Sequence, residues 1–352
     1  MMFDKSYIDF IQYSLNEASF LSDYDRVDWR SFKQFCHLHG IIGLVYAGLE
    51  RADRKIPKDV LFEWIGAVEK LKSQNRIVNK RLLSITKWFE NKNCRSVILK
   101  GQANGLMYPC PELRSPGDID IWIEGRPIDT IKMVLEHCPR AHYSIHHVKM
   151  PAFKDVSIEV HYRPIYLDNW FIDKKLQRFI GDIEKLQFEN IVQLDGQSIG
   201  CLTVEFNVVY LMLHMYHHFF ESRNNFKQFI DYFYLLKKRG TVSTELNDGI
   251  IKQLDQLKVL RYAKGILWIM KEILGLDESY LYVESDEKMG KLILNESMRY
   301  GTFSQNKLMQ VIQQFAGNLR MVRYFPAEVL ISPLFLVWHQ WWKVRMKWKL
   351  TH

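Results

Sequence analysis

The stretch that decides the fold is residues 114–123, which read RSPGDIDIWI. Ser-Pro-Gly is turn chemistry, and the isoleucines that follow recur at every second residue, so the pattern predicts a turn leading into a β-strand over 118–123. Side chains two apart on a strand share a face, about 6.5–7 Å apart along the backbone. We therefore expect Asp118 and Asp120 to point the same way, with the isoleucines packed behind them.

Two carboxylates on one face repel each other unless a cation lies between them. Mg²⁺ is usually held by one or two carboxylates together with substrate phosphates, which makes Asp118 and Asp120 candidate metal ligands. The alternative is an ordinary amphipathic strand with an acidic, solvated face. The spacing of the two residues, taken alone, favours that alternative.

A second motif lies just upstream of this strand. Residues 96–99, SVIL, form a short apolar run, and KGQANGLMY follows at 100–108. This order predicts a strand, a glycine turn and a short helical segment over 101–108. Backbone N–H groups at such a turn attract anions, and Lys100 stands beside them.

The order of strand, glycine turn, helix and Asp-x-Asp strand resembles the nucleotidyltransferase fold of DNA polymerase beta and its relatives. More narrowly, the chain resembles the uncharacterised bacterial nucleotidyltransferase family within that superfamily, over most of its length. The residues that carry this likeness are LKG at 99–101, YP at 108–109, the stretch 114–120, IEVHY at 158–162, Asp28-Trp29 and the segment 214–231.

The resemblance implies a reaction and a set of catalytic residues. In polymerase-beta-like enzymes a third carboxylate comes from a neighbouring strand, and by resemblance this residue is Glu159. Asp118, Asp120 and Glu159 would hold two Mg²⁺ ions, with Mn²⁺ as an alternative, and Glu159 could also be a general base. The implied reaction moves an NMP from an NTP, taken as ATP, to a hydroxyl or phosphate acceptor.

The resemblance also implies where the nucleotide binds. Lys100 and the backbone amides of Gly101 and Gln102 are expected to receive the triphosphate, although the superfamily usually has Gly-Ser here. Arg114 could reach a phosphate or pair with a neighbouring carboxylate, and both readings stay open. The C-terminal helices of related enzymes close over the nucleotide, which adds three candidates: His218, Arg223 and Lys227.

Histidines are expected to support this site. His161 lies two residues beyond the third carboxylate, where we expect it to donate a hydrogen bond. His214, His217 and His218 share one helical face, at a spacing that also suits a metal ion. Packing and hydrogen bonds to the next helix are the favoured reading, with Asp231 as the acceptor, because no Cys or acidic motif at zinc spacing accompanies them.

The hydrophobic pattern predicts an α+β fold in which a small mixed sheet is flanked by helical regions. We expect an N-terminal helical region at 1–95, the nucleotidyltransferase core at 96–202, and a C-terminal helical region with a basic aromatic tail at 203–352. The finer expectations are one or two long helices after residue 58, a helix near 128–137, a hairpin of 143–150 with 156–162, and helices at 205–220, 226–239, 245–274 and 284–318.

The net charge of +8 is concentrated at the C-terminus. Residues 301–352 carry seven basic side chains and one acidic one, a net +6, which leaves +2 for the other 300 residues. A charge confined to a tail does not indicate a nucleic-acid partner. Five Cys residues without a CxxC pair, and an N-terminus without a signal-peptide pattern, indicate a cytoplasmic protein.

The tail itself has two readings. Residues 325–342 are apolar but interrupted by Pro326 and Pro333, and they fall short of the roughly 20 residues that a bilayer crossing needs. With the basic residues that follow, the tail could lie on an anionic membrane surface. The favoured reading is a helix that docks its aromatic face onto the protein and leaves its lysines in solvent.

Two further functions remain open at this point. The same residues could deliver the γ-phosphoryl group, as in a kinase-like phosphotransferase. The chain could also be a non-catalytic nucleotide-binding or regulatory protein, which the unusual Lys-Gly-Gln motif favours slightly. The acceptor, the preferred base and the oligomeric state have no signature in the sequence.

Overall fold

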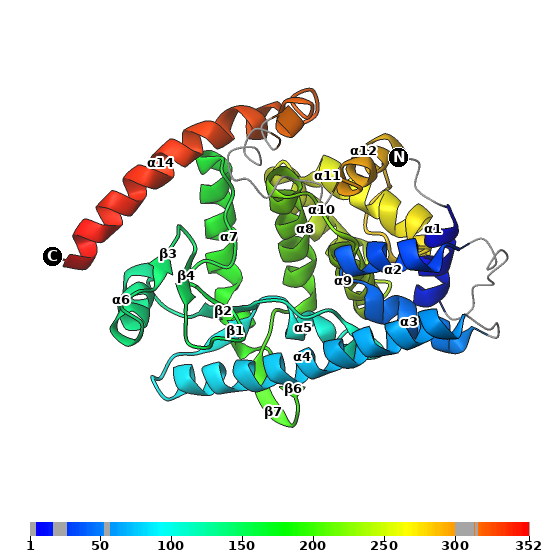
Figure 1. The fold of residues 1–352 in the computed structure, drawn as a ribbon. Coiled ribbons are helices and arrows are strands. Elements are labelled where there is room, and N and C mark those ends of the chain that lie inside the picture. The colour runs from blue at the N-terminus through cyan, green and yellow to red at the C-terminus, as the bar shows by residue number, and fades with distance from the viewer. Residues whose placement is uncertain (1–4, 17–26, 53–56, 300–312, 314–315, 352) are drawn as a thin grey trace.

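The computed structural model describes residues 5–16, 27–52, 57–299, 313 and 316–351 of the chain. It confirms the α+β class: a five-stranded sheet lies between helices from both ends of the chain. Figure 1 shows α4 running beneath β1 and β2, while α7 and α8 rise on the other side of the sheet. The predicted boundaries near 95 and 202 fall between α4 and β1 and between β7 and α8.

The N-terminal region consists of helices, as predicted: α1 (Lys5–Leu15), α2 (Trp29–Leu38), α3 (Ile42–Arg51) and α4 (Lys58–Glu90). Asp28 caps α2, since its side chain accepts hydrogen bonds from the amides of Arg30 and Ser31. The long apolar pattern after residue 58 forms one helix of 33 residues rather than two. The buried side chains near the C-terminal end of α4 pack against the sheet: Val78, Leu82, Ile85 and Phe89.

The sheet contains β1 (Ser96–Ile98), β2 (Ile119–Ile123), β3 (His142–Tyr143), β4 (His147–Met150) and β5 (Ile158–His161). Their spatial order is β1-β2-β5-β4-β3, in which only β2 and β5 run parallel. The predicted hairpin is β4 with β5, and the predicted helix near 128–137 is α6 (Pro127–His137). The short helix after the glycine turn is only α5 (Gln102–Gly105), and η2 (Pro111–Leu113) follows it.

Alternation along β2 and β5 gives the sheet one apolar and one polar face. Ile119, Ile121 and Ile123 belong to the core that includes α4. Asp120 and Trp122 point to the opposite face, because successive side chains of a strand alternate. Phe188 of α7 (Trp170–Glu189) covers Trp122 on that face, with ring centroids 4.8 Å apart.

A two-stranded hairpin, β6 (Ile191–Leu194) with β7 (Gln197–Gly200), was not predicted. Its turn is Asp195-Gly196, and both residues have positive φ, 48° and 76°. Asp-Gly between short alternating runs is a strong hairpin signal, so the sequence contained the information. The helix α7 that precedes this hairpin was also not predicted.

The C-terminal helices are α8 (Val204–Glu221), α9 (Phe226–Arg239), α10 (Thr244–Gln256), α11 (Leu260–Trp268) and α12 (Glu287–Ser297), with the π-helical η3 (Ile269–Ile273) and the short η4 (Glu278–Tyr280). The helix predicted over 245–274 is interrupted near Lys258, which has a φ of 60°. The helix predicted over 284–318 begins as α12, but residues 300–312 of that range lie outside the described residues.

Helices from both ends of the chain share one hydrophobic core. Phe35 of α2 and Phe226 of α9 meet edge to face, with ring centroids 5.4 Å apart. This shared core places α8 and α9 beside the sheet, where their polar side chains can reach the acidic strand.

The tail forms one continuous helix, α14 (Pro326–Thr351), which runs through Pro333. One face docks onto the protein: Phe335 is buried and stacks on Tyr166 at 5.4 Å, and Trp342 meets Tyr143 at 6.2 Å. Figure 1 shows α14 passing the end of α7 and running toward the side of β3 and α6. None of the described helices combines the length and the hydropathy needed to cross a membrane.

We expect the sheet to depend on the apolar end of α4. Phe89→Ala should lower the free energy of unfolding by about 3–5 kcal/mol, because this fully buried ring leaves a cavity against the sheet. Phe62→Ala on the same helix is the matched control, since Phe62 is 70% exposed. Urea unfolding of both variants measures the difference, and equal midpoints would contradict this packing.

Candidate active site

The acidic site is built where the two parallel strands run side by side. Asp120 of β2 and Glu159 of β5 are direct neighbours in the register, as are Trp122 and His161. Asp120, Glu159 and His161 each offer a ligand atom within 4.8 Å of the other two. Asp118, the other aspartate predicted to bind metal, comes just before β2 and lies outside this close group.

Asp120 is 1% exposed and has two polar neighbours. His161 Nε2 lies 3.0 Å from its Oδ1, and Lys100 Nζ lies 3.2 Å from its Oδ2. Burial alone would raise the pKa of Asp120, but the Lys100 ammonium group and the hydrogen bond with His161 together outweigh burial and lower this pKa. In the same way, Asp120 raises the pKa of Lys100 against the effect of burial. In this structure, then, the lysine predicted to receive phosphate provides the counter-charge of the predicted metal ligand.

The pKa of Glu159 is shifted in the opposite direction from that of Asp120. Burial and the nearby charge of Asp120 raise its pKa above the ordinary value. Lys149 Nζ lies 3.2 Å from Oε1, and His147 Nδ1 lies 3.6 Å from Oε2. A carboxylate with a raised pKa accepts a proton more readily, which suits a general base.

A cavity of about 200 Å³ opens beside this group, between the glycine turn, α8 and α9. Asp118 belongs to its wall, so the two aspartates of the Asp-x-Asp motif have different surroundings. Three basic side chains line the cavity: Lys100, Lys227 and Arg114. Eight predicted site residues line the cavity: Lys100, Gly101, Arg114, Asp118, His214, His218, Lys227 and Asp231.

Arg114 pairs with a carboxylate, one of its two predicted roles. Its Nε and Nη2 donate to the two oxygens of Asp231 at 2.7 and 2.8 Å, and the Tyr108 hydroxyl donates to Oδ1 at 2.6 Å. Burial would raise the pKa of Asp231, but Arg114 outweighs it and the pKa is lowered. The prediction that Asp231 accepts hydrogen bonds from the histidines of α8 was therefore wrong.

The glycine turn holds Lys100 close to Asp118. Gly101 has a φ of +65°, and a Cβ built there would lie 3.4 Å from the carbonyl oxygen of Asp118. The Gln102 side chain is buried away from the cavity, where its Nε2 donates to Asn75 at 3.2 Å and also to Asn79. The role predicted for Gln102 toward phosphate belongs to its backbone amide and does not involve this side chain.

The remaining C-terminal candidates separate into two groups. His214 Nε2 lies 3.1 Å from Lys100 Nζ, and His218 lines the same cavity. His217 instead pairs with Glu221 at 3.0 Å, so the three histidines of α8 form no close metal-ligand group among the described residues. Arg223 is buried against Glu296 at 3.1 Å, away from the cavity, and its prediction as a nucleotide contact was wrong.

Lys227 stands near other cations, and this changes its proton affinity. Burial and the Arg114 guanidinium together lower the pKa of Lys227 to about 8. The side chain is therefore mainly charged at neutral pH and loses its charge as pH rises through about 8. A bound anion in the cavity would favour the charged form.

Two histidines near the acidic group were missed in the sequence. His147 of β4 lies opposite His161 in the register, and the ring of His146 lies next to it. The predicted hairpin could have revealed His147, because residues that face each other across antiparallel strands share a face.

A roomier cavity of about 590 Å³ lies between α7, α8 and α10. Its described lining is mainly apolar and includes three glutamates and no basic side chain. Such a wall suits an apolar ligand and repels a polyphosphate. Electrostatics therefore favour the smaller cavity as the anion site.

Comparison with protein families identifies the family to which the chain belongs. A family model described as uncharacterised nucleotidyltransferase matches residues 25–275, which is 251 of the 352 residues. No curated protein matches the chain significantly. Among solved structures, the chain is similar to an antigenic nucleotidyltransferase-like protein from Paracoccidioides brasiliensis, with 14% identity, a TM-score of 0.37, and coverage of 63% of this chain and 96% of that chain. This structural likeness is too low to support an argument about the site.

We expect the Arg114–Asp231 pair to be structural. Asp231→Ala should cost about 3–5 kcal/mol of unfolding free energy, because it leaves a buried guanidinium group without its carboxylate. Adding Arg114→Met should recover part of that loss. Asp129→Ala, which removes the carboxylate of the exposed pair with Arg126, is the control and should leave the denaturation midpoint unchanged. Wild-type stability of Asp231→Ala would contradict the structural role.

The lowered pKa of Lys227 predicts pH-dependent anion binding. With a pKa of about 8, the affinity for sulfate, whose charge is constant in this range, should fall about tenfold between about pH 7 and 9 as Lys227 deprotonates. Lys227→Arg should remove this dependence, since arginine stays charged. Thermal-shift titrations with sulfate at each pH measure it, and an unchanged pH profile in Lys227→Arg would exclude Lys227 as the titrating group.

Proposed function

Because this chain belongs to the uncharacterised nucleotidyltransferase family, we propose that it transfers an NMP from an NTP, taken as ATP, to a hydroxyl or phosphate acceptor. The pairing of Asp120 with Glu159 on parallel strands, beside a cavity with a basic wall, is the observation that carries this proposal. Placement in a bacterial branch of the polymerase-beta-like superfamily stays a prediction, as does a cytoplasmic location.

The donor atoms of the site fit Mg²⁺, with Mn²⁺ as the alternative. Asp120 and Glu159 offer carboxylate oxygens in adjacent register, and Asp118 adds a third at the cavity wall. Oxygen ligands of this kind are those that Mg²⁺ prefers. Two ions bound there would bring the attacking and leaving oxygens together and neutralise their charge.

The chain's own residues have separable tasks in this reaction. The cavity wall would hold the triphosphate through Lys100, Lys227 and the amides of Gly101 and Gln102. The acceptor oxygen attacks the α-phosphorus, the bond from that phosphorus to the bridging oxygen breaks, and pyrophosphate leaves. Glu159, whose pKa is raised, would take the proton from a hydroxyl acceptor.

Lys100 gives this proposal a particular feature. Its ammonium group now neutralises Asp120, at 3.2 Å. If Asp120 held a divalent cation, the carboxylate would no longer need this ammonium group, and Lys100 would be available for phosphate. Lys100 would then act in place of the Ser hydroxyl of the usual motif, as a point charge.

One observation favours a second candidate, a non-catalytic nucleotide-binding protein. The Lys100–Asp120 ion pair, at 3.2 Å, balances the charge of the buried aspartate without any metal, as in a site that no longer needs one. Kinase-like phosphoryl transfer on the same residues is a third candidate. The products distinguish the three: pyrophosphate indicates nucleotidyl transfer, ADP indicates phosphoryl transfer, and binding without turnover indicates the non-catalytic protein.

We expect Mg²⁺-dependent binding of a non-hydrolysable ATP analogue that requires the acidic strand. Asp118→Asn combined with Asp120→Asn should weaken this binding by at least about 100-fold, because both changes remove ligand charge. Asp129→Asn, on the exposed start of α6, is the matched control. Isothermal titration with and without Mg²⁺ measures the effect, and undiminished binding to the double variant would refute the metal site.

A further inference from the structure

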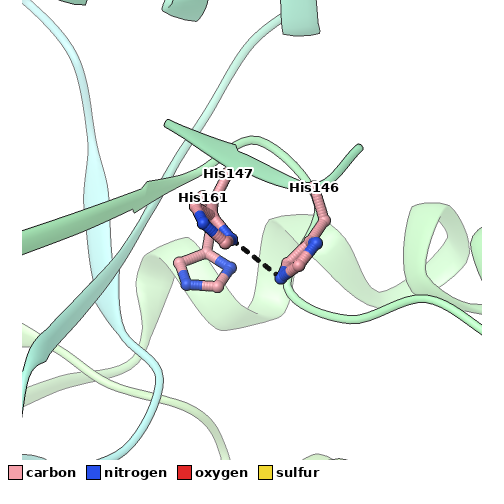
Figure 2. A group of neighbouring side chains, drawn as sticks. All are labelled: His146, His147 and His161. Carbon is pink, nitrogen blue, oxygen red and sulfur yellow. Dashed lines mark hydrogen bonds between the residues drawn. The ribbon is translucent and has the colours of Figure 1, made fainter. Parts of the chain in front are cut away.

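Three imidazoles gather beside Glu159, on the side away from the nucleotide cavity. Figure 2 shows the rings of His146, His147 and His161 close together, with a hydrogen bond between the first two. His147 and His161 face each other across β4 and β5. The carbonyl oxygen of His146 accepts hydrogen bonds from the amides of Tyr162 and Arg163, which fixes the backbone of His146 next to β5.

The distances between their ligand atoms suit a tetrahedral metal ion. His147 Nδ1 lies 2.9 Å from His146 Nε2 and 3.6 Å from Glu159 Oε2, and His161 Nε2 lies 3.9 Å from the same oxygen. All three imidazoles offer a nitrogen within 4.8 Å of the others. Ligands at about 2.0–2.2 Å from one zinc ion lie about 3.3 Å from each other. These three distances, 2.9 to 3.9 Å, bracket that value, and Glu159 joins the group through His147 and His161.

The charges around the cluster also suit a metal ion. His147 and His161 are buried and His146 is half-buried, so little solvent would compete with these rings for an ion. Lys149 occupies Glu159 Oε1 and leaves Oε2 on the histidine side. His161 directs Nδ1 toward the carbonyl oxygen of Arg163 at 3.4 Å, which turns Nε2 to the carboxylates.

We propose that His146, His147, His161 and Oε2 of Glu159 bind a borderline divalent cation of the Zn²⁺ and Co²⁺ class. Imidazole nitrogen favours these ions, whereas Mg²⁺ prefers oxygen. The site shares Glu159 with the proposed Mg²⁺ site, so an ion held by the histidines would withdraw Glu159 from catalysis. Zn²⁺ is therefore expected to inhibit a nucleotidyl transfer that Mg²⁺ supports.

The test is a Co²⁺ titration of the full chain without an affinity tag. We expect the visible absorption band of tetrahedral Co²⁺, lost on adding one equivalent of Zn²⁺ and retained in a 100-fold excess of Mg²⁺. His147→Ala should weaken Co²⁺ binding at least tenfold. His142→Ala, an exposed histidine on β3, should bind like the wild type. No nucleotide is present, so the result does not depend on the proposed transferase activity.

Several outcomes would overturn the site. One is the absence of a tetrahedral band, and another is wild-type Co²⁺ affinity in His147→Ala. If Asp118→Asn lost Co²⁺ binding while His147→Ala kept it, the ion would be bound by the carboxylates instead of the histidines. A melting curve of each variant checks folding, and His146→Gln replaces His147→Ala if the latter is unfolded.

The outer face of α14 carries a second inference from a separate observation. Its apolar side chains follow a spacing of four and three residues, which places them on one stripe of the helix. Their exposed fractions range from 55% to 72%. A contiguous stripe of exposed large apolar side chains is unusual on a protein surface. The stripe consists of Leu330, Leu334, Val337, Trp341 and Val344.

Basic residues accompany this stripe. Arg345 and Lys349 lie beside its second half, and the Arg345 guanidinium lies 5.4 Å from the centre of the Trp341 ring. The opposite face of the helix is already docked through Phe335 and Trp342. Exposed tryptophan and apolar side chains with cations nearby suit the headgroup boundary of a membrane.

We infer that the outer face of α14 binds an anionic lipid bilayer. The charge favours this partner over a parallel pair of copies, because such a pair would bring two cationic helix ends together. Bilayer binding should bury the apolar stripe at the acyl boundary and place the basic side chains among the headgroups. The helix would lie on the membrane surface without crossing it.

Co-sedimentation with vesicles tests this inference. The chain should bind phosphatidylglycerol-containing vesicles, bind less as salt is raised, and not bind pure phosphatidylcholine. Trp341→Glu should reduce binding at least tenfold, and Gln340→Glu, on an exposed neighbouring position, should reduce it far less. The inference fails if anionic vesicles do not bind the chain, or if sedimentation equilibrium shows a dimer that Trp341→Glu dissolves.

Discussion

The parallel pairing of β2 with β5 is the constraint on which the candidate site depends. A strand alternates its side chains between two faces, so this register puts Asp120 and Glu159 side by side and sends the flanking isoleucines into the core. A slip of one residue would turn both carboxylates into the apolar core against α4 and turn Ile119 and Ile158 toward the site. The apolar packing against α4 and the acidic site are thus two results of the same register.

Charge compensation around that register explains the state of the site. Asp120 is buried, and a buried carboxylate needs cationic or hydrogen-bonding partners. Lys100 and His161 supply them, which holds the site together without a divalent cation. A second buried pair, Arg114 with Asp231, ties the acidic strand to α9 and fixes one wall of the cavity.

The sequence revealed the parts of the site that rest on local patterns. Alternation identified β2 and β5, and the glycine after an apolar run identified the turn at Gly101, whose φ is +65°. Pairings between distant residues left no local signal: Arg223 meets Glu296, 73 residues away, and Asp231 meets Arg114, 117 residues away. Spacing on one helix therefore gave Asp231 the wrong partner. The Asp195-Gly196 turn is different, since its signal was present and overlooked.

The central claim is that a divalent cation and a triphosphate meet between the acidic strands and the basic cavity wall. Anomalous diffraction from a crystal grown with Mn²⁺ and a non-hydrolysable ATP analogue tests it most directly. We predict a manganese peak about 2.0–2.2 Å from carboxylate oxygens of Asp120 and Glu159, with the triphosphate beside Lys100 and Lys227. Nucleotide bound in the apolar cavity between α7, α8 and α10, or manganese absent from both carboxylates, would contradict the claim.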